Sequence, residues 1–385
     1  MAQHSLNALL GTKDFLGDPQ VLFDSTWKRW VISVDDFTIP ASTFNYLWLA
    51  VSKTWDATGA WFVYSISFSN GEFVSPNLLD YPHLGMDQDA LLFTGNIFSS
   101  STGRYVDTTA FAIAKARTYN GLGFSFGAFT GLTGTLMPPV QLGAPWYSQY
   151  PFDYFAVADR GSGEYLYTMS NAGKSGYSLT GPVHISGTGA FGMPPSAVQP
   201  GCAQTIDTLD GRFQNACYQV PPFSSYSDGL LYCVHTISNA GRPTPVWYAF
   251  DPSTNGVAAS GAFFHSLTSD DFNPSIAADA VGDIFVTETA TDPTGAVKPM
   301  VLFGGALAGS PVTLSATAAA VSSVCLTGNS FPKNTSPQRW GDYSAARFDP
   351  ATSVNGTAGS VIGWITNQKV VGAKIWGTKI AKIRQ

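Results

Sequence analysis

Charged side chains are scarce in this sequence. Asp, Glu, Lys and Arg make up only 12% of the 385 residues, about half of the fraction that is typical of soluble globular domains. The formal net charge is −6, and the basic residues form no run. Because nucleic-acid binding depends on clustered Lys and Arg, we expect no nucleic-acid partner.

Long apolar runs are missing as well. A helix that crosses a membrane needs about 20 consecutive apolar residues, so we expect no transmembrane segment. The first residues, Met1 to His4, show neither the basic part nor the apolar part of a signal peptide. The low charge and the many Ser, Thr and Gly residues favour a secreted or cell-surface protein, with the signal peptide absent from this chain.

The sequence motifs of several enzyme classes are also absent. There is no GxSxG nucleophile elbow, no P-loop, no GxGxxG that opens a helix, no HExxH zinc motif and no EF-hand spacing. These absences exclude the commonest hydrolase, nucleotide-binding and metalloprotease signatures. They leave open whether the protein is an enzyme.

Cysteine is rare, with four residues in the chain. None of Cys202, Cys217, Cys233 and Cys325 lies in a CxxC pair, so a zinc ribbon is not expected. Cys217 and Cys233 fall in consecutive strand-like runs, where a cross-strand disulfide is one interpretation. A Cys202–Cys325 bridge is another, and free buried thiols are the alternative to both.

The abundant residue types favour strands over helices. Thr, Ser, Tyr, Phe and Val are frequent, aromatic residues make up 14% of the chain, and there are 39 Gly and 24 Pro. Almost no stretch shows the 3.6-residue period of an amphipathic helix. We therefore predict an all-β fold.

A repeated hairpin pattern gives the architecture. Three stretches share a Pro, an apolar alternation, an Asp-bearing tight turn and a second apolar run. They are GDPQVLFDSTWKRWVISV (17–34), DYPHLGMDQDALLFTGN (80–96) and FNPSIAADAVGDIFVTET (272–289). Three weaker copies begin near Tyr150, Leu209 and Trp340.

The spacing of these repeats predicts a single β-propeller domain over residues 1–385. The polar residues at the six starts are Asp18, Asp80, Asp153, Asp210, Asn273 and Asp342. They lie roughly 60 to 70 residues apart, which suits blades of about four strands. We predict six blades, with seven as the alternative, and closure of the ring by pairing of the N- and C-terminal strands.

The order and spacing of several motifs resemble one group of proteins. YPHLGMDQDALLFTGNIFS, LDGRFQNACYQV, FNPSIAADAVGDIFVTE and RWGDYSAARFDP, in this order, are similar to a family of secreted bacterial β-propeller proteins. Some members are loosely called sialidase-like, and most have no assigned function. The resemblance runs from about Asp18 to Ile383 and implies a propeller and export, but no reaction. The Ser-x-Asp-x-Gly-x-Thr-Trp box and the three arginines of sialidases are not evident.

The strand-start aspartates are the first candidate site. In a propeller the innermost strands line one channel, so Asp18, Asp80 and Asp342 are predicted to converge there. Such a group could bind a hard cation, with calcium as the one cofactor considered. It could instead supply the acid and base of a glycosidase. The structural alternative is that each Asp accepts backbone hydrogen bonds in its own turn.

The RWGDYS segment is the second candidate. Arg339 offers a planar fork for a carboxylate, and Trp340 and Tyr343 offer faces on which a sugar can stack. The structural alternative is an Arg339–Asp342 pair with the Trp packed in the core.

Four further residues are candidate ligand contacts. His83 opens a blade, and Arg212 lies on a strand next to that of His235, so that acid–base or anion contacts near the axis are conceivable. Trp146 and Tyr147 belong to a dense aromatic stretch that suits a loop platform for carbohydrate.

These patterns lead to three functional hypotheses. The first is a monomeric propeller that binds a glycan or a similar extracellular polymer at its central funnel, with or without calcium. The second is a glycosidase or polysaccharide lyase that uses the funnel carboxylates Asp18, Asp80 and Asp342. The third is a structural propeller that binds another protein.

Overall fold

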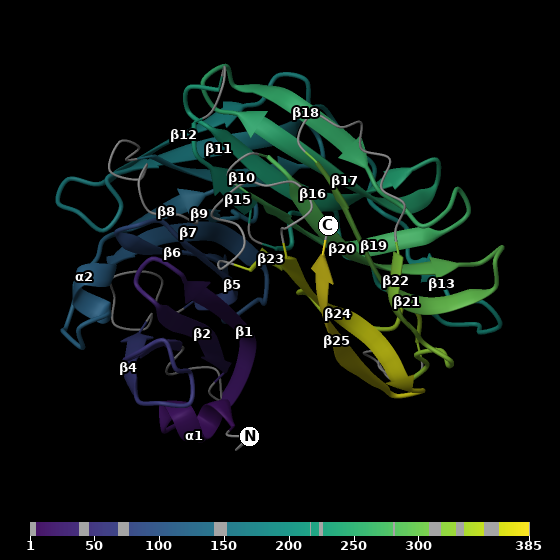
Figure 1. Ribbon diagram of the computed structural model, residues 1–385, viewed down its shortest axis with the longest axis horizontal. Coiled ribbons are helices and arrows are strands. Elements are labelled where there is room, and N and C mark those ends of the chain that lie inside the picture. Colours follow the sequence, from purple (N-terminus) through teal and green to yellow (C-terminus); the bar gives the residue numbers. More distant parts are fainter. Residues whose placement is uncertain are drawn as a thin grey trace. The chain divides into compact units, whose positions relative to one another are not determined.

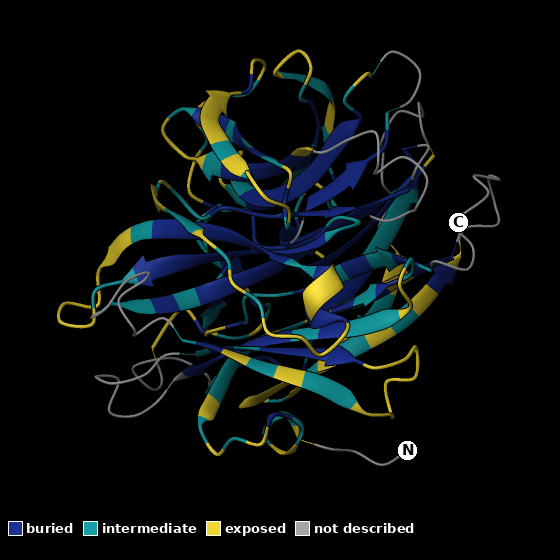
Figure 2. Ribbon diagram, turned by 90° about the vertical axis from the view of Figure 1, so that its left-hand side faces the viewer, coloured by how far each residue is buried: buried dark blue, intermediate teal, exposed yellow. Residues whose placement is uncertain are grey.

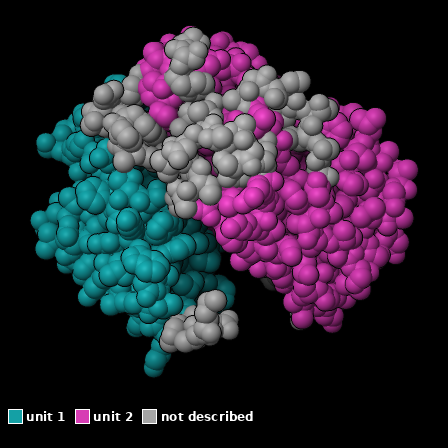
Figure 3. All heavy atoms as spheres, in the orientation of Figure 1, with its two compact units in different colours: residues 1–155, 167–181 teal, residues 156–166, 182–385 magenta. Residues whose placement is uncertain are grey.

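The computed structural model describes most of the chain (Figure 1). The described residues are 5–37, 46–67, 77–141, 152–215, 217–222, 226–279, 282–307, 317–328, 335–349 and 362–384. They form two compact units, coloured in Figure 3: unit 1 is Met1–Phe155 with Tyr167–Gly181, and unit 2 is Ala156–Leu166 with Pro182–Gln385. Strands dominate both units, so the predicted all-β fold class is confirmed.

Unit 1 holds two antiparallel sheets whose strands follow one another along the chain. The first has the order β1 (Phe15–Asp24), β2 (Arg29–Phe37), β3 (Tyr46–Ser52) and β4 (Trp61–Ser67). The second has the order β5 (Leu78–Met86), β6 (Ala90–Phe98), β7 (Tyr105–Ala114) and β8 (Ala128–Leu132), with β9 (Pro139–Gln141) parallel to β5.

Two short helices accompany these sheets, α1 (Leu6–Leu10) and α2 (Lys115–Thr118). The Ser5 hydroxyl caps the first turn of α1, and Gly11 ends the helix in the left-handed conformation. Leu10 then packs against Val34 and Ala50. Neither helix is long enough to cross a membrane, and no other helix occurs in the described ranges.

A third sheet has the order β10 (Phe152–Asp159), β11 (Gly163–Ser170) and β12 (Ser178–His184), and its residues are divided between the units. In unit 2, β13 (Ala197–Val198) and β14 (Thr205–Ile206) form a ribbon. Three antiparallel sets follow. They are β15 (Cys217–Val220), β16 (Leu230–Asn239), β17 (Arg242–Asp251) and β18 (Gly256–Ala262); β19 (Asp270–Ala278), β20 (Ile284–Asp292), β21 (Val297–Ala306) and β22 (Thr317–Val321); and β23 (Ala345–Phe348), β24 (Ile362–Gly372) and β25 (Ile375–Arg384).

The predicted tight turns rest on aspartates. Asp24 Oδ1 accepts the backbone N–H groups of Thr26 and Trp27, both at 3.0 Å, in the β1–β2 turn. Asp87 does the same in the β5–β6 turn and Asp292 in the β20–β21 turn. These side chains satisfy turn amides that the sheet leaves unpaired, which is why Asp recurs there.

The predicted pairing of the two chain ends is not seen in the described residues. The first sheet is complete from the consecutive strands β1 to β4, and β25 pairs along its whole length with β24. The tight β24–β25 hairpin therefore holds the C-terminal strand within the last sheet. The closed six-bladed ring and the single domain over 1–385 stay predictions.

Burial is greatest along the middle of the sheets (Figure 2). In unit 2 every residue of β19 and β20 is buried, including the polar ones. In unit 1 all of β6 except its last residue is buried. Polar side chains on these strands must therefore find partners inside the protein or hold a ligand.

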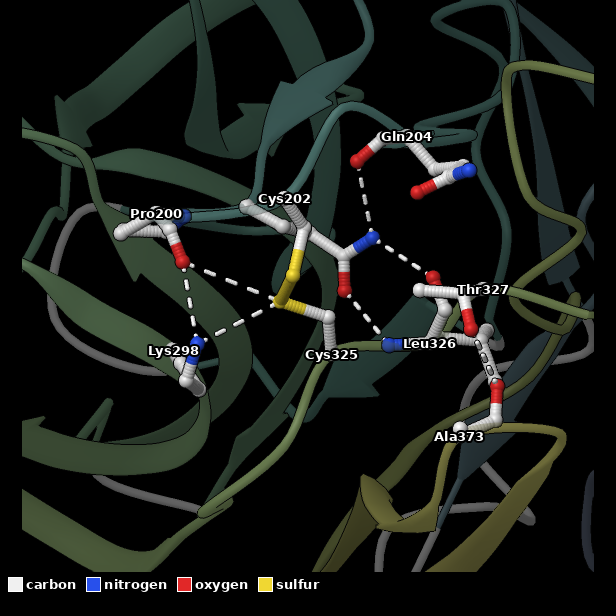
Figure 4. The surroundings of a disulfide bond; sticks show 9 residues. Pro200, Cys202, Gln204, Lys298, Cys325, Leu326, Thr327 and Ala373 are labelled. Carbon is white, nitrogen blue, oxygen red and sulfur yellow. Dashed lines mark hydrogen bonds between the residues drawn. A yellow bond between two sulfur atoms is a disulfide. The ribbon is translucent and has the colours of Figure 1, made fainter.

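Both possible disulfides form, and both lie in unit 2. Cys217 and Cys233 join the neighbouring strands β15 and β16, and Cys202 joins Cys325 across 123 residues (Figure 4). Beside the second bridge, the buried Gln199 side chain donates to Leu326 O and accepts from Leu326 N, each at 2.8 Å. The two disulfide interpretations are confirmed, and the free-thiol alternative is wrong.

Candidate functional site

Three sheets share an unusual break at the start of their first strand. The strand register shifts between Gly17 and Gln20 in β1, between Asp80 and His83 in β5, and between Phe272 and Ser275 in β19. At each break the residue before a proline has a positive φ: 48° at Asp18, 56° at Tyr81 and 53° at Asn273. A residue before proline prefers extended backbone, and a non-glycine residue at positive φ is strained, so this conformation has to be held by its surroundings.

The breaks correct the sequence alignment by one residue. The structural equivalent of Asp18 and Asn273 is Tyr81 and not Asp80, because the proline that follows fixes the register of each break. Asp80 lies one position earlier, at the end of the regular pairing with Asn96.

In unit 1 the breaks in β1 and β5 bring three carboxylates together. Asp18 comes from the break in β1, Asp80 from β5, and Asp35 from β2, where it pairs with Gly17. One side-chain oxygen from each of the three lies within 4.8 Å of the others. We call these residues the carboxylate cluster.

Asp35 is the member that the sequence did not reveal, and it is the most deeply buried. Its side chain is 0% exposed, and neither oxygen accepts a hydrogen bond from another described residue. Burial first, and then the charges of Asp18 and Asp80, raise its pKa to about 8; its own backbone N–H acts in the opposite direction. Two consecutive acidic residues, Asp35 and Asp36, near the end of β2 were the sequence signal that could have revealed it.

The donor set of the cluster fits a hard divalent cation. Ca²⁺ binds oxygen ligands at about 2.3–2.6 Å, so oxygens that lie within 4.8 Å of one another can contact one ion together. Carboxylate oxygens are the ligands that this cation prefers, and a charge of +2 would offset their mutual repulsion. Three protein ligands leave positions for water or for ligand hydroxyls.

Neighbouring side chains join β1 and β5, two of the three strands that carry the cluster. Gln20 Nε2 in β1 donates to Pro82 O at 2.8 Å, and Leu84 N donates to Gln20 Oε1 at 2.8 Å. Gln20 Nε2 also lies 3.3 Å from His83 Nδ1, and the His83 and Tyr81 rings meet edge to face at 4.4 Å. His83 is therefore a buried neighbour of the cluster, and its role as a ligand contact stays a prediction.

The RWGDYS segment lies in unit 2. Arg339 Nη2 donates to Asp342 Oδ2, which is the pairing of the structural alternative. Trp340 is 1% exposed and packs edge to face on Phe272 with ring centroids 5.8 Å apart. This burial removes Trp340 from the candidate ligand contacts, because its indole faces are covered by the core. The grouping of Asp342 with Asp18 and Asp80, and the ligand roles of Arg339 and Tyr343, stay predictions.

The remaining candidates are spread over the chain. Arg212 pairs with Asp210, with Nε 2.6 Å from Oδ1, and is half-buried. Trp146 and Tyr147 lie outside the described residues. Their role as a carbohydrate platform stays a prediction, and so does the role of Arg212 as a ligand contact.

A buried acid–base pair in unit 2 was not foreseen. His235 Nε2 lies 3.6 Å from Glu164 Oε1, both side chains are fully buried, and His235 Nδ1 is 2.7 Å from Gly211 O. Burial raises the pKa of Glu164 to about 7 and lowers the pKa of His235 to about 4. Both groups are thus uncharged between these values, and Phe191 packs edge to face on the His235 ring.

Comparisons with known proteins leave the chain without an assigned family. No protein-family model matches the sequence. A search of curated proteins also finds no match.

Solved structures give only distant likenesses. A Trypanosoma rangeli sialidase in complex with sialic acid matches with a TM-score of 0.36 and 10% identity over 92% of this chain and 44% of its own. The GH43_1 enzyme from Xanthomonas citri complexed with xylose matches with a TM-score of 0.33 and 10% identity over 80% of this chain and 88% of its own. A mutant of the Trypanosoma rangeli sialidase displaying trans-sialidase activity gives 0.31 and 11%, over 75% of this chain and 53% of its own. This chain thus spans less than half of the first sialidase, and likenesses at this level carry no assignment of function.

Proposed function

We propose that the protein binds a divalent cation, Ca²⁺, at the carboxylate cluster and uses it to hold the hydroxyl groups of an extracellular glycan. One observation carries this proposal. The fully buried carboxyl of Asp35 has no hydrogen-bond partner from another described residue and lies within 4.8 Å of two further carboxylates.

Electrostatics favours an ion at this place. A buried carboxylate without a hydrogen-bond donor is costly, and two more carboxylates beside it add repulsion. A cation removes both costs at once. The oxygen ligands that Ca²⁺ still lacks after three carboxylates are supplied well by water or by vicinal sugar hydroxyls.

The rest of the chain supports an extracellular setting. Two disulfides are formed, which is typical of secreted and cell-surface proteins. Extracellular calcium modules bind the ion with dissociation constants of about 10⁻⁴ to 10⁻³ M, and we expect an affinity in this range. A secreted or surface-displayed glycan-binding protein is the function that this site supports best.

Calcium binding is tested by calorimetric titration of chelator-treated protein. Wild-type protein is expected to bind one Ca²⁺ per chain, and Asp35→Asn is expected to lose this binding. Glu288→Gln, which changes a fully buried carboxyl in unit 2, is the matched control and should bind as the wild type does. Absence of calcium binding by the wild type, or equal binding by Asp35→Asn, would refute the cation site.

Glycan binding is tested on a glycan array with Ca²⁺ and with EGTA. We expect ligands that are retained in Ca²⁺ and lost in EGTA, and the same ligands lost in Asp35→Asn. Glycan binding that is unchanged by EGTA and by Asp35→Asn would show that it does not depend on the cation, and would contradict the proposal.

Glycoside hydrolysis is the second candidate, and the spacing of the carboxylates favours it. The cluster oxygens lie no more than 4.8 Å apart, and a short separation of roughly 5–5.5 Å between two carboxyl groups is typical of retaining rather than inverting glycosidases. Release of reducing ends from a panel of polysaccharides, abolished in Asp80→Asn, would support it. Unchanged release in Asp80→Asn and in Asp342→Asn would sink this assignment of residues.

A further inference from the structure

A cavity in unit 1 lies beyond the ends of β1 and β5 that are opposite to the carboxylate cluster. It has a volume of about 370 Å³ and is lined by residues that include Trp27, Asp89, Lys115, Tyr119, Asn120 and Lys174. Asp18 lies near the start of β1, whereas Trp27 follows the end of β1. This volume is at the lower end of the range for small-molecule sites and suits about one or two sugar rings.

A fixed indole forms one wall of this cavity. Trp27 is 49% exposed. Its ring Nε1 donates to Gln88 O at 2.9 Å, and its backbone N donates to Asp24 Oδ1 at 3.0 Å. A half-exposed tryptophan that is held at both its ring and its backbone presents a flat face without further ordering cost, which is what stacking of a sugar ring requires.

Polar groups stand at the mouth of the same cavity. Lys174 Nζ lies 2.7 Å from Asp89 Oδ2, and both side chains remain accessible. Gly173 allows this approach, because its φ is +68° and a Cβ there would lie 3.0 Å from the Cβ of Ala90. A carboxylate next to an ammonium can accept from and donate to neighbouring hydroxyls of one sugar ring.

The floor of the cavity is charged but internally neutral. Lys115 Nζ lies 2.5 Å from Asp24 Oδ2, and the Tyr119 hydroxyl donates to the same oxygen at 2.9 Å. Lys115 and Asp24 are both buried, and Lys115 also donates to Asp87 O. Each lysine of the cavity is thus matched by an aspartate, so the lining offers no excess charge to an anionic ligand.

We propose that this cavity is a second saccharide site, which binds an uncharged pyranose without a cation. The sugar ring stacks on Trp27, and its hydroxyls bond to Asp89 and Lys174. The site goes beyond the cation site proposed above, because the two share no residue and sit at opposite ends of β1. Its ligand class follows from the balanced charges and the exposed indole.

The test is calorimetric titration in EGTA with uncharged trisaccharides of glucose, xylose and mannose, and with trigalacturonate as the charged counterpart. At least one uncharged trisaccharide is expected to bind more tightly than trigalacturonate. Trp27→Ala should weaken this binding about tenfold or more, and Trp27→Phe should retain part of it because a ring face remains. Trp55→Ala removes an even more exposed indole that does not line the cavity and should bind as the wild type does.

Three results would overturn the inference. They are no binding of any uncharged trisaccharide in EGTA, tighter binding of trigalacturonate than of the uncharged trisaccharides, and wild-type affinity in Trp27→Ala. Asp35→Asn separates the two proposals, since it should abolish calcium binding and leave the EGTA-resistant saccharide binding intact. Loss of that binding in a folded Asp35→Asn would contradict the second site, and failure of calcium binding alone would contradict only the first.

Discussion

Strand β1 of unit 1 and strand β19 of unit 2 begin with the same backbone conformation but differ in the chemistry of their side chains. Asp18 in unit 1 and Asn273 in unit 2 both precede a proline, both have positive φ, and both sit in a break of the strand register. In unit 1 the break gathers carboxylates around Asp35. In unit 2 it gathers amides and hydroxyls.

The unit 2 group is a buried hydrogen-bond network, in which Asn273 Oδ1 accepts no hydrogen bond from the described residues. Asn273 Nδ2 donates to Asn367 Oδ1 at 3.1 Å and to Gln368 Oε1 at 2.5 Å. Ser344 Oγ donates to Asn273 O at 3.0 Å, and Asn215 Nδ2 donates to the carbonyl of the following proline at 2.7 Å. The strained residue is therefore held by neighbours of the same unit.

This difference separates a structural use of the strand break from a functional one. In unit 2 most polar groups around Asn273 bond to one another, which fixes the structure without a ligand. In unit 1 the buried carboxyl of Asp35 accepts no hydrogen bond from another described residue, so it needs a proton or a cation to be stable there. The same break in strand register thus has a structural role in unit 2 and forms part of a candidate binding site in unit 1.

The largest expected effect on stability comes from placing the aspartate of the unit 1 strand break at the equivalent position of unit 2. Asn273→Asp keeps the shape and tolerates positive φ, but a carboxylate cannot donate to Asn367 and Gln368. We expect a loss of about 3 to 5 kcal/mol of unfolding free energy, measured by urea denaturation. Asn255→Asp, at an exposed position with φ of 51°, is the control and should cost little. A stable Asn273→Asp variant would contradict this account of the network.

The next effect concerns pH. In unit 2, burial raises the pKa of Asp271 to about 7, and burial together with Asp271 raises the pKa of Glu288 well above its usual range. The folded pair therefore keeps a proton that the unfolded chain releases near pH 4. Between about pH 4 and pH 7 stability should fall as pH rises, by about 1.4 kcal/mol per pH unit for each such group. Urea denaturation across this range, in EGTA, measures the slope.

Glu288→Gln tests the origin of this slope. Glutamine imitates the protonated acid and does not titrate, so stability should depend less on pH while remaining near the wild-type value at pH 5. Addition of Ca²⁺ should leave the contribution of this pair unchanged, in contrast to that of Asp35 in unit 1. An equally steep slope in Glu288→Gln would assign the pH dependence to other groups.

A smaller effect, this time a gain in unfolding free energy, is expected when the unit 1 aspartate is replaced by the asparagine that unit 2 has at the equivalent position. Asp18→Asn removes one negative charge from the cluster, and Asn accepts the φ of 48°. Without a cation this should stabilise the protein by about 1 to 2 kcal/mol, because the remaining carboxylates repel each other less. In saturating Ca²⁺ the order should reverse, since the variant loses a ligand. Denaturation in EGTA and in Ca²⁺ provides both values, and a destabilised variant in EGTA would speak against a repulsive cluster.

The smallest effect is expected at Arg339. Its ion pair with Asp342 is partly exposed, with side chains 46% and 17% accessible. Arg339→Ala should therefore change the unfolding free energy by less than about 1 kcal/mol. A larger loss, measured by the same denaturation, would show that this pair is as important to unit 2 as the buried amide network.

The sequence allowed prediction of features that depend on near neighbours. Proline, apolar alternation and turn aspartates such as Asp24 act within a few residues, and they predicted the hairpins correctly. Asp18 and Asp80 could be selected because each lies one or two residues before a strand-start proline. Asp35 could not, since its place in the cluster depends on its cross-strand pairing with Gly17. The register of β5 was misjudged by one residue for the same reason.

Features built from distant segments were beyond sequence patterns. The cavity beside Trp27 combines three turns and the α2 segment, from four separate parts of unit 1, and no local sequence motif predicts it. Trp340 looked like a ligand contact because it stands in a polar motif. Its packing on Phe272, 68 positions earlier in the chain, shows that it belongs to the core.

The Cys202–Cys325 bridge has a consequence for resistance to proteolysis. A single backbone cut anywhere between these residues, which are 123 positions apart, leaves two fragments that are still covalently joined. Both ends of the nicked loop also stay hydrogen-bonded through Gln199 and Leu326. A cleaved molecule would thus migrate as an intact chain until a reductant is added, and unit 2 would keep its parts together after damage that separates an unbridged chain.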